Sequence, residues 1–149
     1  MTILPQFGNV FLTLIYFVVA LSIIVGVHEY GHYIVGRWSG IKAEVFSIGF
    51  GPVLLAREDK HGTVWQIAAI PFGGYVKFLG DANAASGKDG EAMEAMPAEQ
   101  LRHTMHGAPL WARSATVLAG PVFNFNFSIF VFAGLLLSLG MVATPPKIS

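Results

Sequence analysis

Residues 10–35 read VFLTLIYFVVALSIIVGVHEYGHYIV, an apolar run that ends in two histidines and a glutamate. A membrane-crossing helix needs roughly 20 apolar residues to span a hydrocarbon core of about 30 Å. The run therefore predicts a transmembrane helix over Val10–Val35 that ends near Gly40. A cleavable signal peptide is the alternative, but no basic residue precedes the run, so we interpret it as a retained helix.

The composition of the whole chain supports a membrane protein. Charged residues make up 12% of the 149 residues, whereas soluble domains carry roughly 25%. Ser114–Pro146 contains no charged residue, which predicts a second span over Ala115–Val142 that stops at Pro145-Pro146. The formal net charge of zero gives no reason to expect a nucleic-acid partner. The absence of cysteine leaves His, Asp, Glu and backbone oxygen as metal ligands.

The segment between the spans changes character. Residues 41–79 are rich in Val, Ile, Phe, Trp and Gly, and we expect a membrane-associated hairpin there. Residues 81–94 predict a flexible loop, and Pro97–His106 a short helix. The fold class is a membrane protein, mainly α, with two transmembrane helices flanking a β-hairpin-rich cytoplasmic region. Its expected strands are Ala43–Ile48, Val53–Arg57, Thr63–Ile70 and Tyr75–Phe78, and its expected regions are 1–40, 41–80, 81–113 and 114–149.

The basic residues predict the orientation. Eight of the nine Lys and Arg residues lie between Arg37 and Arg113. By the positive-inside rule, residues 37–113 are expected in the cytoplasm, with both ends of the chain on the opposite side. Residues 114–149 would then include the start of a periplasmic region.

The motif with chemical meaning is His28-Glu29-Tyr30-Gly31-His32, of the form H-E-x-x-H. On a helix, two histidines four residues apart project from one face and can share a Zn²⁺ ion. Glu29 would take a proton from the attacking water and pass it to the leaving amine. A chance pentapeptide is the alternative, but ionisable groups at membrane depth are expensive and favour a functional site.

Further motifs follow in order along the chain. They are Phe46-Ser47-Ile48-Gly49-Phe50-Gly51-Pro52, Ile70-Pro71-Phe72-Gly73-Gly74-Tyr75-Val76-Lys77, Trp111-Ala112-Arg113 and Ala119-Gly120-Pro121-Val122-Phe123-Asn124-Phe125. With Val27–His32, these motifs resemble the site-2 protease family of intramembrane zinc metalloproteases, most closely the bacterial regulator-of-sigma-E protease type. The resemblance covers residues 25–130, about two-thirds of the chain.

The resemblance implies zinc bound by His28 and His32, with Glu29 catalytic. It implies hydrolysis of single-span membrane proteins such as anti-sigma factors, in the bilayer of a bacterial inner membrane. It also implies that the β segment presents substrate as a strand, so we predict substrate contacts at Gly73, Gly74 and Tyr75. A plain structural hairpin is the alternative. Asn124 shares a helix face with Gly120 and Ser128, which indicates helix packing, and it could also hold substrate.

The sequence departs from the family in one respect. A catalytic zinc site usually has three protein ligands. The resemblance to the family implies that the third ligand is an aspartate in a later transmembrane segment. No such motif occurs here. We expect the chain to be the N-terminal portion of a longer protease whose downstream part supplies that aspartate. The 149-residue chain alone is then expected to be inactive.

Two other functions remain open from the sequence. One is a non-catalytic membrane scaffold or metal-binding protein on the same framework, and the other is a simple two-span anchor. The remaining histidines, His61, His103 and His106, are interpreted as loop residues, because no acidic partner for them is evident. The tryptophans, Trp38, Trp65 and Trp111, are interpreted as interface anchors or packing residues.

Overall fold

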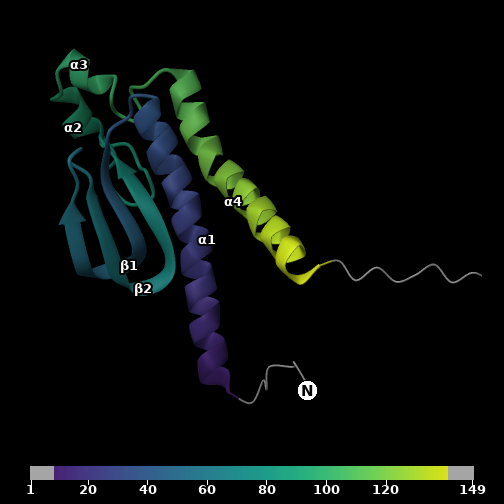
Figure 1. Cartoon of the computed structure of the whole chain (residues 1–149). Coiled ribbons are helices and arrows are strands. Elements are labelled where there is room, and N and C mark those ends of the chain that lie inside the picture. The colour runs from purple at the N-terminus through teal and green to yellow at the C-terminus, as the bar shows by residue number, and fades with distance from the viewer. Residues whose placement is uncertain (1–8, 141–149) are drawn as a thin grey trace, which may run out of the picture.

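The structure is a computed structural model that describes residues 9–140. Its elements are α1 (Val10–Trp38), β1 (Ala43–Glu58), β2 (Val64–Phe78), α2 (Gly90–Glu94), α3 (Ala98–Leu101) and α4 (Leu110–Leu139). The two long helices meet at the end where α1 finishes and α4 begins, and they diverge toward the other end (Figure 1). The sheet packs beside α1, away from the splayed part of α4. By length and composition, α1 and α4 could each cross a membrane.

The first helix matches its predicted bounds, whereas the second starts earlier than predicted. α1 starts at Val10 as expected, where the Asn9 side chain caps it by accepting from the backbone N–H of Leu12 at 3.3 Å. It continues to Trp38, close to the predicted end near Gly40, and Gly40 follows with a φ of +83°. α4 begins at Leu110, before the predicted Ala115. The predicted end of the second span at Val142 and the stop at Pro145-Pro146 lie outside the described residues.

The four predicted strands are two long strands that bend back along themselves. β1 and β2 pair antiparallel, and residues 43–48 of β1 lie against residues 74–78 of β2. Residues 45–48 also pair on their other side with 64–67, where both residue numbers rise together, and 53–58 pair with 64–68. The bends lie at the glycine-containing stretches 49–52 and 69–73. Gly49 and Gly51 have positive φ there. Glycine adopts this conformation readily, which explains why glycines occur at a bend inside a long strand.

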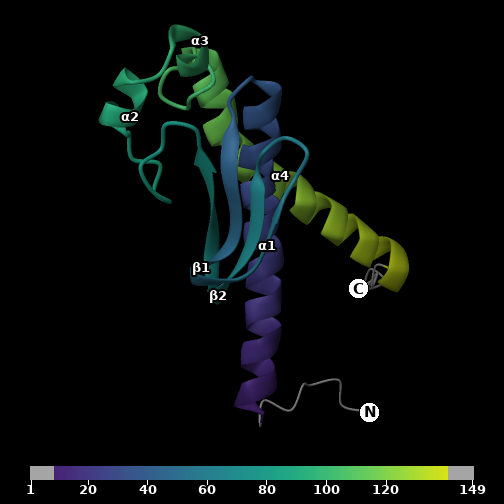
Figure 2. The ribbon, with the colours of Figure 1, turned by 90° about the vertical axis from the view of Figure 1, so that its left-hand side faces the viewer.

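The bent end of the sheet is apolar and exposed. Leu54 and Phe72 are 69% and 63% exposed, and this end lies alongside the middle of α1 (Figure 2). A sheet tip of this kind suits lipid rather than water. The opposite end of the sheet packs onto α1 and α4 through a buried cluster that includes Tyr33, Phe46 and Phe78.

The segment after β2 has more structure than the predicted loop. An isolated bridge joins Asp81 to Lys88, and α2 follows at Gly90–Glu94. α3 covers only Ala98–Leu101, so the predicted helix Pro97–His106 is too long by several residues. His106 also has an acidic neighbour that the sequence did not reveal. Its Nε2 atom lies 3.6 Å from the buried Asp81 carboxylate.

Candidate metal centre and adjoining cavity

The helices α1 and α4 cross closely at small residues. A Cβ on Gly31 would lie 2.7 Å from the backbone oxygen of Ala119, which is too close for any side chain. Small residues at such a crossing let two helix backbones approach, as is common for helices in membranes. The approach places the last part of the H-E-x-x-H motif directly against α4.

The two histidines of the motif lie next to each other and face α4. The ring centroids of His28 and His32 are 4.7 Å apart, with an interplanar angle of 80°. The Nδ1 atom of His32 lies 2.7 Å from the backbone oxygen of Thr116, so the ring donates its Nδ1–H to that carbonyl. This bond fixes the ring and leaves Nε2 as the atom with a free lone pair.

His28 is held by the side-chain amide of Asn124. The two groups are 3.2 Å apart, measured from His28 Nδ1 to the amide nitrogen, while Asn124 Oδ1 is buried without a hydrogen-bond partner. An amide turned with Oδ1 toward the ring accepts the His28 Nδ1–H and satisfies that oxygen. Each histidine would then have its Nε2 lone pair free to bind a metal ion. The groups that orient the two rings, on Thr116 and Asn124, both come from α4.

The two Nε2 atoms converge on Gly120 of α4. A Cβ built on Gly120 would lie 2.8 Å from His28 Nε2 and in closer contact still with His32 Nε2. Only glycine leaves this space open. Two neutral imidazoles with converging Nε2 atoms are a donor pair that suits Zn²⁺, and the orienting partners on their Nδ1 atoms are typical of zinc-bound histidine. His28 and His32 are therefore suited to be two of the ligands of a zinc ion.

A third ligand does not come from the part of the chain that the structure describes. Among residues 9–140, no group of three His, Cys, Asp or Glu side chains lies close enough to hold a metal ion. The histidine pair is therefore a partial site within these residues.

A cavity of about 230 Å³ adjoins the histidines. Glu29 and His32 line it from α1, and Gly74 and Tyr75 line it from β2. Val76 of β2 lines the same cavity as Glu29. Gly74 allows the close approach of strand to helix, since a Cβ there would lie 2.6 Å from the Ser47 oxygen and 3.3 Å from Glu29 Cγ. The cavity thus brings a carboxylate, an imidazole and a strand edge together.

The predicted site residues fall into three places. Glu29, His32, Gly74 and Tyr75 share the cavity, and His28 lies beside His32. Asn124 contacts His28 rather than lining the cavity, and Gly73 also lies outside its lining, packed against the Phe50 ring. The roles assigned to all these residues stay predictions.

Sequence reasoning missed two parts of the site. The first part is Thr116, whose backbone oxygen binds His32. Thr116 lies four residues before Gly120 and so shares the helix face of Gly120 and Asn124, and this spacing was the sequence signal that could have indicated it. The loop between Asp81 and Lys88 is the second part, because its residues Ala84 and Ser86 also line the cavity. No local pattern in the sequence indicates that fold-back.

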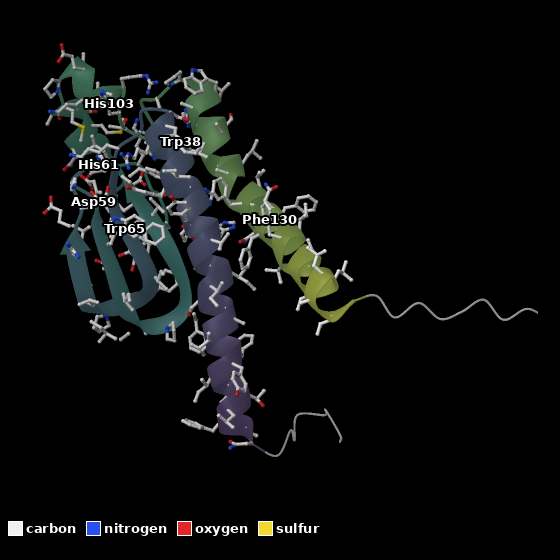
Figure 3. All side chains as sticks on the ribbon, in the orientation of Figure 1. Trp38, Asp59, His61, Trp65, His103 and Phe130 are labelled. Carbon is white, nitrogen blue, oxygen red and sulfur yellow. The ribbon has the colours of Figure 1, made fainter. Side chains whose placement is uncertain are left out.

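A second polar cluster ties the turn between the strands to α1 (Figure 3). Asp59 accepts from the Tyr33 hydroxyl at 3.1 Å and from Trp65 Nε1 at 2.9 Å. It also accepts from the backbone N–H groups of His61 and Thr63. Burial alone would raise the pKa of Asp59, but these donors outweigh it and lower the pKa from 3.8 to about 2. Trp65 is therefore a packing residue, whereas Trp38 and Trp111 are exposed.

Comparison with known proteins places the chain. The sequence profile of peptidase family M50 matches residues 16–146. The chain belongs to peptidase family M50. The resemblance to the site-2 protease family noted from the motifs is thereby confirmed.

Several relatives in this family carry metalloprotease names. A provisionally named zinc metalloprotease of Agrobacterium fabrum is 50% identical over 133 residues, which cover 89% of this chain and 35% of the relative. A provisionally named zinc metalloprotease of Mesorhizobium japonicum is 48% identical over 138 residues, or 92% of this chain and 38% of the relative. Metalloprotease MmpA of Caulobacter vibrioides is 45% identical over 132 residues, or 83% of this chain and 33% of the relative. The chain spans about a third of the length of these relatives.

Proposed function

We propose that this chain supplies two zinc ligands and the general base of an intramembrane metalloprotease that cleaves single-span membrane proteins. The observation that carries the proposal is the convergence of His28 Nε2 and His32 Nε2 at Gly120, with Glu29 lining the adjoining cavity. A structural hairpin or a plain anchor has no need for two imidazoles oriented in this way by a second helix. The names of the relatives and membership of family M50 support the same reaction class.

The chain's own groups have separate roles in this reaction. His28 and His32 hold the metal, while Thr116 and Asn124 keep their rings oriented through Nδ1. Zinc, when bound, supplies Lewis acidity that polarises the substrate carbonyl and makes water more acidic. Glu29 accepts the proton of the attacking water and delivers it to the nitrogen of the departing peptide.

The strand edge beside Glu29 is the proposed seat of the substrate. Residues 74–78 pair with β1 on one side, and within residues 9–140 no strand pairs with them on the other. An extended segment of substrate could hydrogen-bond along this edge and place a peptide bond at the cavity. A transmembrane helix shields its peptide bonds with internal hydrogen bonds, so the strand edge would also favour the unwound form that can be attacked.

The remaining parts of the proposal concern the protein's surroundings. The third zinc ligand is proposed to be an aspartate from a downstream part of the same protease. We place α1 and α4 across a bacterial inner membrane, with residues 37–113 in the cytoplasm. Anti-sigma factors and similar single-span proteins are the proposed substrates, in regulated intramembrane proteolysis.

The decisive experiment uses a longer protein that carries this sequence. Glu29→Gln should abolish cleavage of a single-span reporter and leave its zinc content unchanged, because Gln has a similar shape but cannot accept the proton. His28→Ala should remove both zinc and cleavage. Glu44→Gln is the matched control, since Glu44 lies on the sheet and pairs with Lys77. Undiminished cleavage in Glu29→Gln would contradict the role given to Glu29, whereas no cleavage by the unaltered protein would favour a scaffold on the same framework.

A further inference from the structure

The face of α1 turned away from His28 and His32 carries a basic cavity at the end of the helix and an apolar groove further along it. We propose that this face binds one anionic phospholipid, with its phosphate at Arg37 and Lys42 and an acyl chain along the groove. The proposal depends on membrane insertion of α1 and does not depend on proteolysis.

The basic cavity lies where α1 ends. Its volume is about 260 Å³, and it is bounded by the end of α1, the start of β1 and the turn after β1. Four basic side chains line it, from Arg37, Lys42, His61 and His103, and no carboxylate does. Figure 3 shows His61 and His103 at this end of the molecule, at about the level of Trp38. Arg and Lys side chains grouped in this way favour an anionic oxygen ligand.

Within residues 9–140 no carboxylate forms an ion pair with the cations of this cavity, although Glu58 and Lys42 both lie 3.9 Å from a Cβ built on Gly62. Arg37 Nη2 contacts His61 Nε2 at 2.6 Å, so its nearest side-chain partner is an imidazole rather than a carboxylate. Asp59 is close and ionised, and its oxygens accept hydrogen bonds from four neutral donors, on Tyr33, Trp65 and two backbone N–H groups, rather than from Arg37. Within residues 9–140, neither Arg37 nor Lys42 forms an ion pair.

The apolar groove follows α1 away from the basic cavity. Its volume is about 630 Å³. Val19, Ile23 and Tyr30 are among the α1 residues that line it, while Phe46, Ile48 and Trp65 close it from the sheet. Apart from Ser22, the tyrosine hydroxyl and the indole nitrogen, its lining side chains are hydrocarbon. A groove of this composition at bilayer depth suits an acyl chain.

Tyr33 lies between the two parts. It lines the basic cavity, and its ring lies 6.1 Å from the Tyr30 ring and 5.0 Å from the Trp65 ring, both of which line the groove. A helix turns by about 100° per residue. Five residues therefore lie about 160–220° around the helix from His28: Val19, Ile23, Gly26, Tyr30 and Arg37. One stripe of α1 therefore runs from the groove to the cation, on the side opposite the zinc ligands.

Charge complementarity selects a lipid over other occupants. A single phospholipid joins an anionic phosphate to hydrocarbon, in the order in which this stripe offers cations and apolar surface. Trp38, 74% exposed at the same end of α1, suits the membrane interface where headgroups lie. Anionic lipids of the cytoplasmic leaflet attract basic residues at that depth.

Native mass spectrometry of the detergent-solubilised chain tests the proposal. The probes are phosphatidylglycerol and phosphatidylcholine with the same acyl chains, and soluble glycerol phosphate. We expect one phosphatidylglycerol per chain, preferred over phosphatidylcholine. Each basic residue near the interface contributes roughly a fivefold preference, so Arg37→Gln with Lys42→Gln should lower phosphatidylglycerol affinity about 25-fold. Glycerol phosphate should bind far more weakly, because it has no acyl chain.

Two further variants distinguish binding of the phosphate from binding of the acyl chain, and from a general effect of positive charge. Gly26→Leu should reduce retention of both lipids, since a Cβ there meets only Ile48 at 3.6 Å and the side chain can enter the groove. Arg113→Gln with Lys88→Gln removes two cations outside the cavity and should leave binding intact. Circular dichroism checks that each variant keeps its helices. Equal retention of the two lipids, an equal loss in the control, or glycerol phosphate binding as tightly as the lipid would overturn the proposal.

Discussion

Replacing Gly120 by alanine probes the geometry of the histidine pair most sharply. Ordinary van der Waals contact of a Cβ begins at 3.4 Å, and the built Cβ lies 2.8 Å from His28 Nε2. That nitrogen must therefore retreat by about 0.6 Å, and His32 Nε2 by more. Metal–ligand distances tolerate changes of only about 0.2 Å. We expect zinc affinity to fall by at least the roughly 10- to 100-fold that follows the loss of an orienting partner.

Gly134→Ala is the matched control for this change. Gly134 also lies in α4, but a Cβ there meets nothing within 4 Å. Both substitutions give α4 the same gain in helix propensity, about 0.5–1 kcal/mol, so only the effect on the histidines differs. The assay is zinc competition against a chromogenic chelator in detergent, with helix content followed by circular dichroism. Equal zinc affinities for the two variants would refute the convergence of the two Nε2 atoms at Gly120.

Three further substitutions test other contacts. Asn124→Ala should lower zinc affinity about 10- to 100-fold by releasing His28, whereas Asn126→Ala, which loses only a bond within its own helix, should not; equal effects would contradict the role given to Asn124. Gly31→Ala should destabilise the α1–α4 crossing by about 1–3 kcal/mol in chemical unfolding, and full stability would show that the helices lie further apart. Asp59→Asn should cost about 1–2 kcal/mol at neutral pH. Because the folded-state pKa of about 2 lies below the ordinary 3.8, this stabilisation is complete above about pH 5 and fades as pH falls toward 2, so a pH-independent loss would count against it.

The features that local sequence encodes were predictable. The apolar run that ends in H-E-x-x-H predicts the helix. Helical periodicity then places His28 and His32 on the same face of that helix, because they are four residues apart. The tendency of residues 41–79 to form strands was also visible. The bends were not, because Gly49 and Gly51 look like strand ends, and only the structure shows that residues 45–48 pair with two segments of β2, one on each side.

Long-range contacts account for what the sequence did not reveal. The bond from His32 to Thr116 joins residues 84 apart, and only the packing of α1 on α4 creates it. The approach of His106 to Asp81 likewise depends on how the segment after β2 folds back. Neither contact leaves a periodic pattern. Within residues 9–140, no third His, Cys, Asp or Glu side chain lies close enough to share a metal ion with His28 and His32.

X-ray absorption at the zinc edge tests the central claim most directly, in a zinc-loaded longer protein that carries this sequence. We predict two imidazole nitrogens at about 2.0–2.1 Å with oxygen completing the shell, and loss of the imidazole signal when His28 and His32 are both replaced by alanine. A zinc spectrum with no imidazole, or one that survives the double replacement, would contradict the account.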